Sequence, residues 1–157
     1  MAPAGFGANI PVAAQLLRVP GFSQWFLRAF GDRVIQSSID QMVAENPAAQ
    51  QAIRAAYAEQ MQYHGYKRAL QSTLLHNPLV DLGADYARVG RLGKPAALFW
   101  GDHDVIVPFA QHEQVQQRIP HVEFHAVPGA GHTVNYERPD VVNPKLIAFL
   151  RRPPGDS

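Results

Sequence analysis

The most regular pattern of hydrophobic positions lies within residues 95–132. Residues 96–100 are all apolar, and the run follows Pro95 and ends at Gly101. No polar residue within it indicates a solvent-exposed face. Such a run is typical of a strand that is covered on both sides, as in a parallel sheet. Residues 121–127 alternate polar with apolar positions, which predicts a second strand with one drier face at the edge of the sheet.

A helix is predicted between these two strands. Pro108 suits the first turn of a helix whose body runs to about Arg118, and Pro120 ends it. A strand, a helix and a parallel strand form a βαβ unit, in which both strands end at the same edge of the sheet. We therefore expect Asp104, which follows the first strand, to meet His132, which follows the second.

The first half of the chain has a helical pattern. We predict five helices, separated by turn or capping residues, over residues 9–19, 22–30, 32–43, 47–61 and 66–76. Gly31 is expected to end the second helix and Asp32 to cap the third. Asn46 and Pro47 read as the N-cap and first residue of the fourth.

An aromatic stripe marks the second of these helices, and an internal proline marks one further helix near the end of the chain. Phe22, Trp25, Phe26 and Phe30 share one helix face, and we expect them to pack between helices. A helix from Arg138–Pro139 would place a second apolar face on residues Val142, Leu146, Phe149 and Leu150. Pro144 is expected either to kink that helix or to move its start to Asn143, and residues 151–157 to form a frayed polar tail.

Composition narrows the function classes. The 157 residues suit one domain, and a formal charge of +1 with interspersed charges argues against nucleic acid as a partner. The absence of cysteine excludes a disulfide framework and a thiolate metal site, and is compatible with a cytoplasmic location. The first 17 residues carry no charged side chain but contain prolines and glycines, so neither a signal peptide nor a membrane span is predicted.

The expected meeting of Asp104 and His132 points to proton transfer. A carboxylate can hold one imidazole nitrogen, which fixes the tautomer and stabilises the imidazolium that forms when the other nitrogen takes a proton. Two alternatives stay open: Asp104 could cap the following helix, and Asp102 could be the partner of His132 instead. Glu137 is expected to support the loop and helix behind His132.

A metal site is a second chemical interpretation. His121, Glu123 and His125 alternate along the predicted second strand and so share one face. The rise of a strand spaces these side chains too widely for one ion, so a solvated edge face is the better account. We therefore expect no metal ligands here.

Four stretches together resemble a known family: LFWGDHDVIVP at 98–108, VPGAGH at 127–132, ERP at 137–139 and AFL at 148–150. In order and spacing they resemble the C-terminal third of an α/β-hydrolase, most closely the capped esterases, epoxide hydrolases and carbon–carbon bond hydrolases. On this resemblance Asp104 matches the triad acid and His132 the triad base.

The resemblance also implies an organisation for the whole chain. The expected fold class is α/β: two parallel strands with helices, forming the C-terminal part of the α/β-hydrolase fold, preceded by an α-helical cap. Residues 1–8 would be the end of a core strand, residues 9–80 the cap over the active site, and residues 81–157 the C-terminal core segment.

The family's nucleophile is missing. No G-x-S-x-G elbow occurs, and none of the five serines lies between two glycines; Ser23 comes nearest, inside a helical pattern. The oxyanion-hole donors that accompany the elbow are missing with it. We therefore expect a truncated or split hydrolase that begins within the domain and is inactive alone.

The resemblance implies a function for the intact enzyme. It would hydrolyse an ester or related acyl bond of a small-molecule substrate, or an epoxide if the nucleophile is an aspartate, without a metal or organic cofactor. The alternative is a non-catalytic remnant that binds a small ligand or a partner through its cap. An exposed sheet edge and apolar helix faces would also favour self-association.

Overall fold

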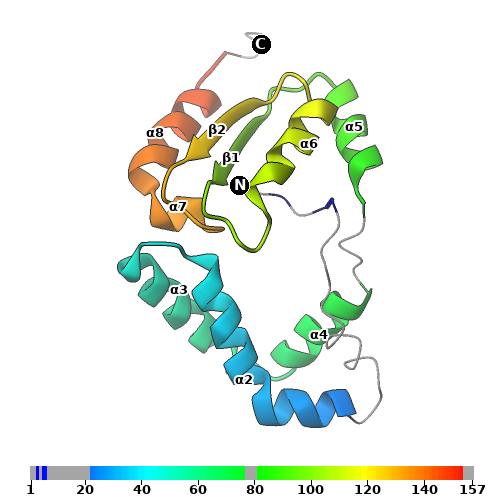
Figure 1. Cartoon of the computed structure of the whole chain (residues 1–157), viewed down its shortest axis with the longest axis vertical. Helices are drawn as coiled ribbons and strands as arrows, with labels where there is room; N and C mark the ends of the chain where they lie inside the picture. The colour runs from blue at the N-terminus through cyan, green and yellow to red at the C-terminus, as the bar shows by residue number, and fades with distance from the viewer. Residues whose placement is uncertain (1–2, 4, 7–21, 77–80, 154–157) are drawn as a thin grey trace.

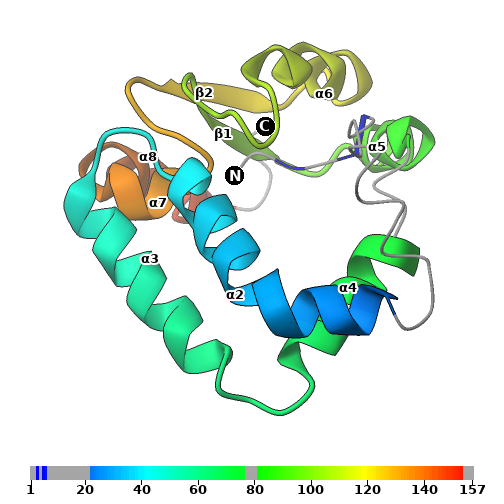
Figure 2. The same cartoon turned by 60° about the horizontal axis from the view of Figure 1, so that its bottom comes forward.

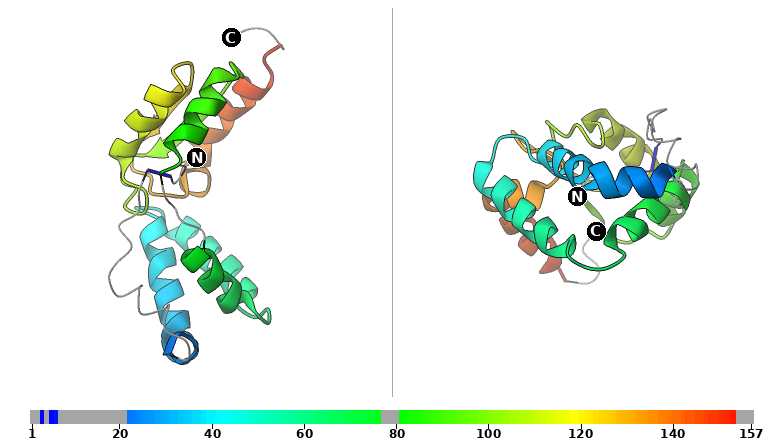
Figure 3. Two further views of the ribbon diagram at one scale, coloured as in Figure 1. Left: turned by 90° about the vertical axis from the view of Figure 1, so that its right-hand side faces the viewer. Right: turned by 90° about the horizontal axis from the view of Figure 1, so that it is seen from below.

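A two-stranded parallel sheet between helices lies above a separate layer of three helices in this computed structural model (Figure 1). The structure describes residues 3, 5, 6, 22–76 and 81–153. The helical layer holds α2 (Phe22–Met42), α3 (Pro47–Gln60) and α4 (Tyr66–His76). The α/β layer holds α5 (Gly83–Arg91), β1 (Ala97–Gly101), η2 (Phe109–Gln111), α6 (His112–Arg118), β2 (Glu123–Val127), α7 (Val134–Glu137) and α8 (Pro139–Leu150). Figure 3 shows the two layers stacked end to end.

The predicted βαβ unit is confirmed. Strands β1 and β2 pair in parallel, in a register that runs from Ala97 opposite Glu123 to Gly101 opposite Val127. The second strand starts two residues later than the alternation predicts, because the N–H of Val122 donates to the carbonyl of Ile119 at 3.0 Å and holds a turn there. Both strands nevertheless end at the same edge of the sheet.

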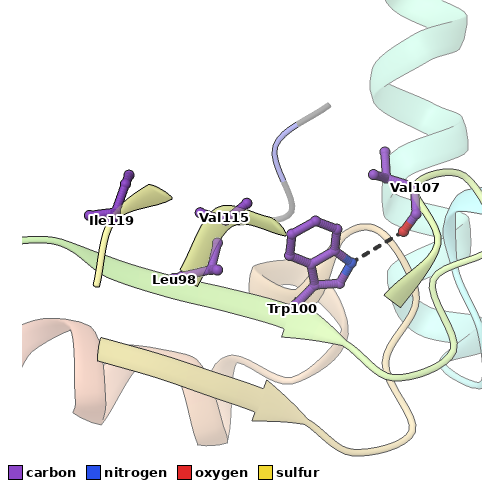
Figure 4. Close-up of a cluster of buried hydrophobic side chains, with 5 residues drawn as sticks. All are labelled: Leu98, Trp100, Val107, Val115 and Ile119. Atoms are coloured by element: carbon purple, nitrogen blue, oxygen red, sulfur yellow. Dashed lines mark hydrogen bonds between the residues drawn. The ribbon is translucent and has the colours of Figure 1, made fainter. Parts of the chain in front are cut away.

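Helices cover both faces of the sheet. On one face α6 packs on β1 in a buried cluster, drawn in Figure 4, of Leu98, Trp100, Val107, Val115 and Ile119. On the other face a second cluster joins β1 and β2 to α7 and α8, and consists of Phe99, Val127, Ala130, Val134 and Val142. Because successive β1 side chains enter opposite clusters, the apolar run has no polar position.

The helical layer has its own apolar core. Helices α2 and α3 bury a cluster of Ile35, Ile39, Val43, Ala49 and Ile53. The predicted cap of α3 is confirmed: the Asn46 side chain accepts a hydrogen bond from the Ala49 N–H at 3.0 Å, and Pro47 is the first helical residue. The layer is thus stabilised largely from within.

The predicted break at Gly31 is wrong. Helix α2 continues from Phe22 to Met42, and Asp32 pairs with the Lys67 ammonium of α4 at 2.7 Å instead of capping a new helix. One glycine inside a helix costs only about 1 kcal/mol relative to alanine. Burial of Ile35 and Ile39, one and two turns further along the helix, outweighs that cost.

Two residues of the aromatic stripe are exposed and do not form part of a core between helices. The side chain of Trp25 is 57% exposed and that of Phe30 is 38% exposed, so the prediction is wrong for both. Their rings lie 5.9 Å apart, and the ring of Phe26 lies 5.5 Å from that of Phe30, so these three side chains contact one another along their own helix. These residues precede the part of α2 that contributes to the α3 cluster, which begins at Ile35.

Helix α8 keeps its proline inside. It starts at Pro139 and runs through Pro144, so the predicted start at Asn143 is wrong. A proline at the first helical position is already set for helical geometry, which favours the earlier start. Val142 is buried as predicted, but Leu146 and Leu150 are exposed.

Some expectations fall outside the described residues. The helix predicted over 9–19 and residues 154–157 of the tail are among them. Near the first residues, the ring of Phe6 stacks on Tyr86 of α5, with centroids 4.9 Å apart. No helix in the described segments combines the length and apolarity needed to cross a bilayer.

Trp100 should be the most informative probe of core stability. Its side chain is fully buried, and its indole N–H donates to the Val107 carbonyl at 3.2 Å. Trp100→Phe should lower the free energy of unfolding by about 1–3 kcal/mol in urea titrations, because it leaves both a void and an unpaired carbonyl. The same change at the exposed Trp25 should cost less than about 0.5 kcal/mol; equal losses would contradict this account.

Candidate functional site

The two loops that follow the strands lie against each other. The N–H of Asp102 donates to the Val127 carbonyl at 3.4 Å, and the N–H of His103 donates to the Ala130 carbonyl at 3.0 Å. Gly101 allows this approach, because a Cβ there would lie 2.2 Å from the carbonyl oxygens of Ala130 and Gly131. A side chain at position 101 would therefore force the loops apart.

Asp104 and His132 meet above the strand ends, as the parallel pairing requires. Nδ1 of His132 lies 2.9 Å from Oδ2 of Asp104, whose side chain is fully buried. The other oxygen, Oδ1, accepts the N–H groups of Ile106 and Val107, both at 2.9 Å. Asp104 therefore caps the turn before η2 while it holds the imidazole, so the capping alternative and the pairing with His132 are compatible.

The hydrogen bond to Asp104 determines the tautomer of the neutral His132 ring. A carboxylate can only accept a hydrogen bond, so Nδ1 of the neutral ring must carry the proton. Nε2 is then the nitrogen that can take a proton from another group. The His132 side chain is 26% exposed, which leaves a path for a reacting partner. The N–H of His132 donates to the Met42 carbonyl of α2 at 2.8 Å, so its backbone is tied to the helical layer.

Asp102 has a different partner. Its Oδ1 accepts the N–H of Gly129 at 2.8 Å, in the turn that leads to His132. Gly129 has a φ of +68°, a conformation that favours glycine. The alternative in which Asp102 pairs with His132 is therefore wrong: Asp102 braces the turn, and Asp104 contacts the ring.

Glu137 supports the loop that carries His132, as predicted; this loop, residues 128–133 between β2 and α7, is called the histidine loop. Its carboxylate is buried and accepts the N–H of Gly131 at 2.9 Å and the N–H of Thr133 at 3.2 Å. The same carboxylate accepts the N–H of Ala44 at 2.8 Å. This last contact could not be predicted from the sequence, because its donor is a main-chain N–H group in the α2–α3 connection and does not depend on the residue type.

His121, Glu123 and His125 have separate contacts in the structure. His121 lies before β2 and its Nε2 contacts the Lys94 carbonyl at 2.9 Å, so it does not share the strand face. Glu123 pairs with Arg152, and the ring of His125 stacks on Phe99 with centroids 4.8 Å apart. Within the described residues, no group of three His, Cys, Asp or Glu side chains could hold a metal ion.

No described serine occupies a strand-to-helix turn. Ser23, Ser37 and Ser38 lie in α2, and Ser72 lies in α4. The hydroxyl of Ser38 donates to the Val34 carbonyl of its own helix at 2.9 Å. The fifth, Ser157, lies outside the described residues.

Comparison with known proteins gives one family and a shared fold. A model described as the alpha/beta hydrolase family matches residues 1–145. A curated relative, an uncharacterized hydrolase (YugF) of Bacillus subtilis (strain 168), is 30% identical over 61 residues, which are 39% of this chain and 22% of the relative.

Two solved structures share the fold. An esterase from Thermogutta terrifontis has a TM-score of 0.68 and 21% identity, over 95% of this chain and 53% of its own. The 2-hydroxy-6-oxo-6-phenylhexa-2,4-dienoate hydrolase from Rhodococcus sp. strain RHA1 has a TM-score of 0.66 and 22% identity, over 95% of this chain and 52% of its own. The chain thus spans about half the length of these structures.

Replacing Asp104 should cost stability through its buried hydrogen bonds. Asp104→Asn places an amide donor against the ring N–H of His132, and should lower the free energy of unfolding by about 1–3 kcal/mol. Asp102→Asn keeps an acceptor for the Gly129 N–H at an exposed site, and should change the free energy of unfolding by less than about 0.5 kcal/mol. Urea unfolding followed by circular dichroism measures both, and equal losses would count against the buried network.

His125 should make stability depend on pH. Burial lowers the pKa of its imidazole below the ordinary 6.5, and the Lys145 ammonium lowers it further. The unfolded chain then binds this proton first as the pH falls, so stability is full above about pH 6.5 and declines below it. His125→Gln should flatten the decline between pH 7 and 5 in urea unfolding; parallel curves for the two proteins would contradict this assignment.

Proposed function

The chain belongs to the α/β-hydrolase family, and from this premise we propose that Asp104 and His132 are the acid and base of a nucleophile–His–acid triad. The bond that such a triad would hydrolyse is an ester or a related acyl bond. One observation carries the proposal: the contact of 2.9 Å between the His132 ring and a buried carboxylate at the shared end of two parallel strands. Open α/β sheets bind their ligands at that end.

The proposed reaction follows from the direction of the hydrogen bond. Asp104 holds Nδ1, so Nε2 of His132 takes the proton of the nucleophile while the nucleophile attacks the carbonyl carbon. His132 then gives this proton to the leaving alcohol as the acyl bond breaks. In the second half His132 takes a proton from water, whose oxygen attacks the acyl carbon. The bond between that carbon and the nucleophile then breaks, the acid is released, and His132 returns the proton to the nucleophile.

The nucleophile, in this proposal, is supplied by residues other than those of this chain. The chain has no cysteine and no serine in a G-x-S-x-G elbow, and four of its serines lie within helices. Without a nucleophile and oxyanion hole, an acid–base pair retains little activity, because these groups act as a unit. An aspartate nucleophile would make an epoxide the substrate instead.

Helices α2 to α4 are, in the same proposal, a cap beside the triad. The connection between α2 and α3 lies against α7 and the histidine loop (Figures 1 and 2). The Met42 carbonyl accepts the His132 N–H at 2.8 Å, so the connection between α2 and α3 of the cap would lie beside the base. A cap in this place would shape the substrate pocket.

A second candidate function is a non-catalytic module that binds a small ligand through the helices. A groove of about 440 Å³ between α2 and α3 favours it. Its wall combines the apolar Ile39 and Met61 with the ion pair of Asp40 and Arg54. That volume is within the range of small-molecule sites.

Esterase assays separate the two functions. The chain alone should hydrolyse p-nitrophenyl butyrate no faster than its His132→Ala variant. A chimaera that joins the first half of a thermophilic esterase, through its nucleophile elbow, to this chain should hydrolyse the ester. His132→Ala in the chimaera should lower kcat roughly 10³-fold or more, whereas His121→Ala, at the far end of the strands, should leave it within about twofold.

Two results would contradict the proposal. Turnover by the chain alone that disappears in His132→Ala would place a nucleophile within these 157 residues. Activity of the chimaera that survives His132→Ala would remove His132 from the role of base. Circular dichroism of each variant shows whether a loss of activity reflects a loss of fold.

A further inference from the structure

Glu137 lies where the helical layer meets the histidine loop. Its side chain is 2% exposed, and all four of its hydrogen-bond partners are donors. Oε2 accepts the N–H groups of Ala44 at 2.8 Å and Gly131 at 2.9 Å. Oε1 accepts the N–H and hydroxyl of Thr133, at 3.2 and 3.1 Å. One buried carboxylate therefore binds both layers at once.

The backbone on both sides of His132 depends on these contacts. The N–H groups of Gly131 and Thr133 bind Glu137, and the N–H between them, that of His132, binds the Met42 carbonyl. Three consecutive amides are thus fixed either by Glu137 or by the end of α2. A shift of the α2–α3 connection would therefore move the backbone that carries the imidazole.

The approach of the two layers is close. A Cβ at Gly131 would lie 2.8 Å from the Met42 carbonyl oxygen and 2.9 Å from the Ala44 nitrogen. The Asn46 side-chain amide also donates to the Glu137 carbonyl at 2.8 Å, so a second bond runs from the α2–α3 connection to Glu137, in the same direction as the bond from Ala44. Three hydrogen bonds between polar groups link the layers here, whereas each layer buries its apolar clusters internally.

We propose that Glu137 is a positioning residue that couples the helical layer to His132. This inference rests on the proposed function in one respect: it bears on catalysis only if His132 is the base. The position of the helical layer would then determine the position of the His132 ring. Charge-assisted hydrogen bonds to backbone N–H groups are strong enough for this role. Glu137 touches no reacting atom, so it acts through the loop alone.

Amide hydrogen exchange of the full chain by NMR tests the coupling. Glu137→Gln keeps the shape of the side chain but turns one acceptor into a donor that faces N–H groups. The amides of Ala44, Gly131 and Thr133 should exchange about ten- to a hundredfold faster. The decisive signal is the His132 amide, which binds Met42 and not Glu137: coupling requires it to accelerate by a similar factor, and the ring signals of His132 should shift with it.

Glu45→Gln is the matched control. Glu45 is an exposed glutamate of the same connection, 3.7 Å from the His103 ring and outside the Glu137 contacts. This variant should leave the four amides and the His132 ring unchanged. Faster exchange confined to Gly131, Thr133 and Ala44, with the His132 amide and ring unchanged, would overturn the proposal.

The wild-type chain provides a second measurement if Glu137→Gln does not fold. Exchange in increasing, sub-denaturing urea gives the opening free energy of each amide. Coupling predicts that Ala44 and His132 share one opening free energy and one urea dependence; independent openings would overturn it. Neither measurement depends on hydrolytic activity. If the chain shows this coupling but the chimaera shows no activity that depends on His132, the proposed function is refuted and the coupling is still supported.

Discussion

The hydrogen bond between the His132 ring and the Asp104 carboxylate depends on how two strands pair. Gly101 lies opposite Val127 in a parallel register, so the chain leaves both strands at one edge and the two loops run together. The absence of a side chain at Gly101 lets the loops touch. With the strands antiparallel, or displaced by one residue, the acid and the imidazole would face different surroundings.

Burial of Asp104 holds its carboxylate in a fixed position against the His132 ring. Asp104 is enclosed, and the N–H groups of Ile106 and Val107 occupy one of its oxygens, so the carboxylate is held in place before any reaction. The ring that it holds stays partly open. A fixed acceptor behind a partly exposed imidazole is the arrangement that general base catalysis needs, and the proposed role of His132 rests on it.

Much of this arrangement follows from the sequence, and the rest does not. The apolar run before Gly101 and the turn before His132 predict the sheet and the meeting of Asp104 with His132, because parallel connections allow few alternatives. The continuation of α2 through Gly31 and the exposure of Trp25 depend on which helices pack together, which local patterns do not determine. The contact from Ala44 to Glu137 was also beyond prediction, since backbone donors are the same at every residue except proline.

The position of the ring proton of His132 tests the central claim most directly. Two-dimensional NMR of the 15N-labelled chain distinguishes the two neutral tautomers of this histidine by the shifts of its ring nitrogens. The account predicts a proton on Nδ1, held by Asp104, with Nε2 unprotonated. A neutral ring with its proton on Nε2 and an unprotonated Nδ1 would show that the carboxylate does not hold the imidazole, and would contradict the account.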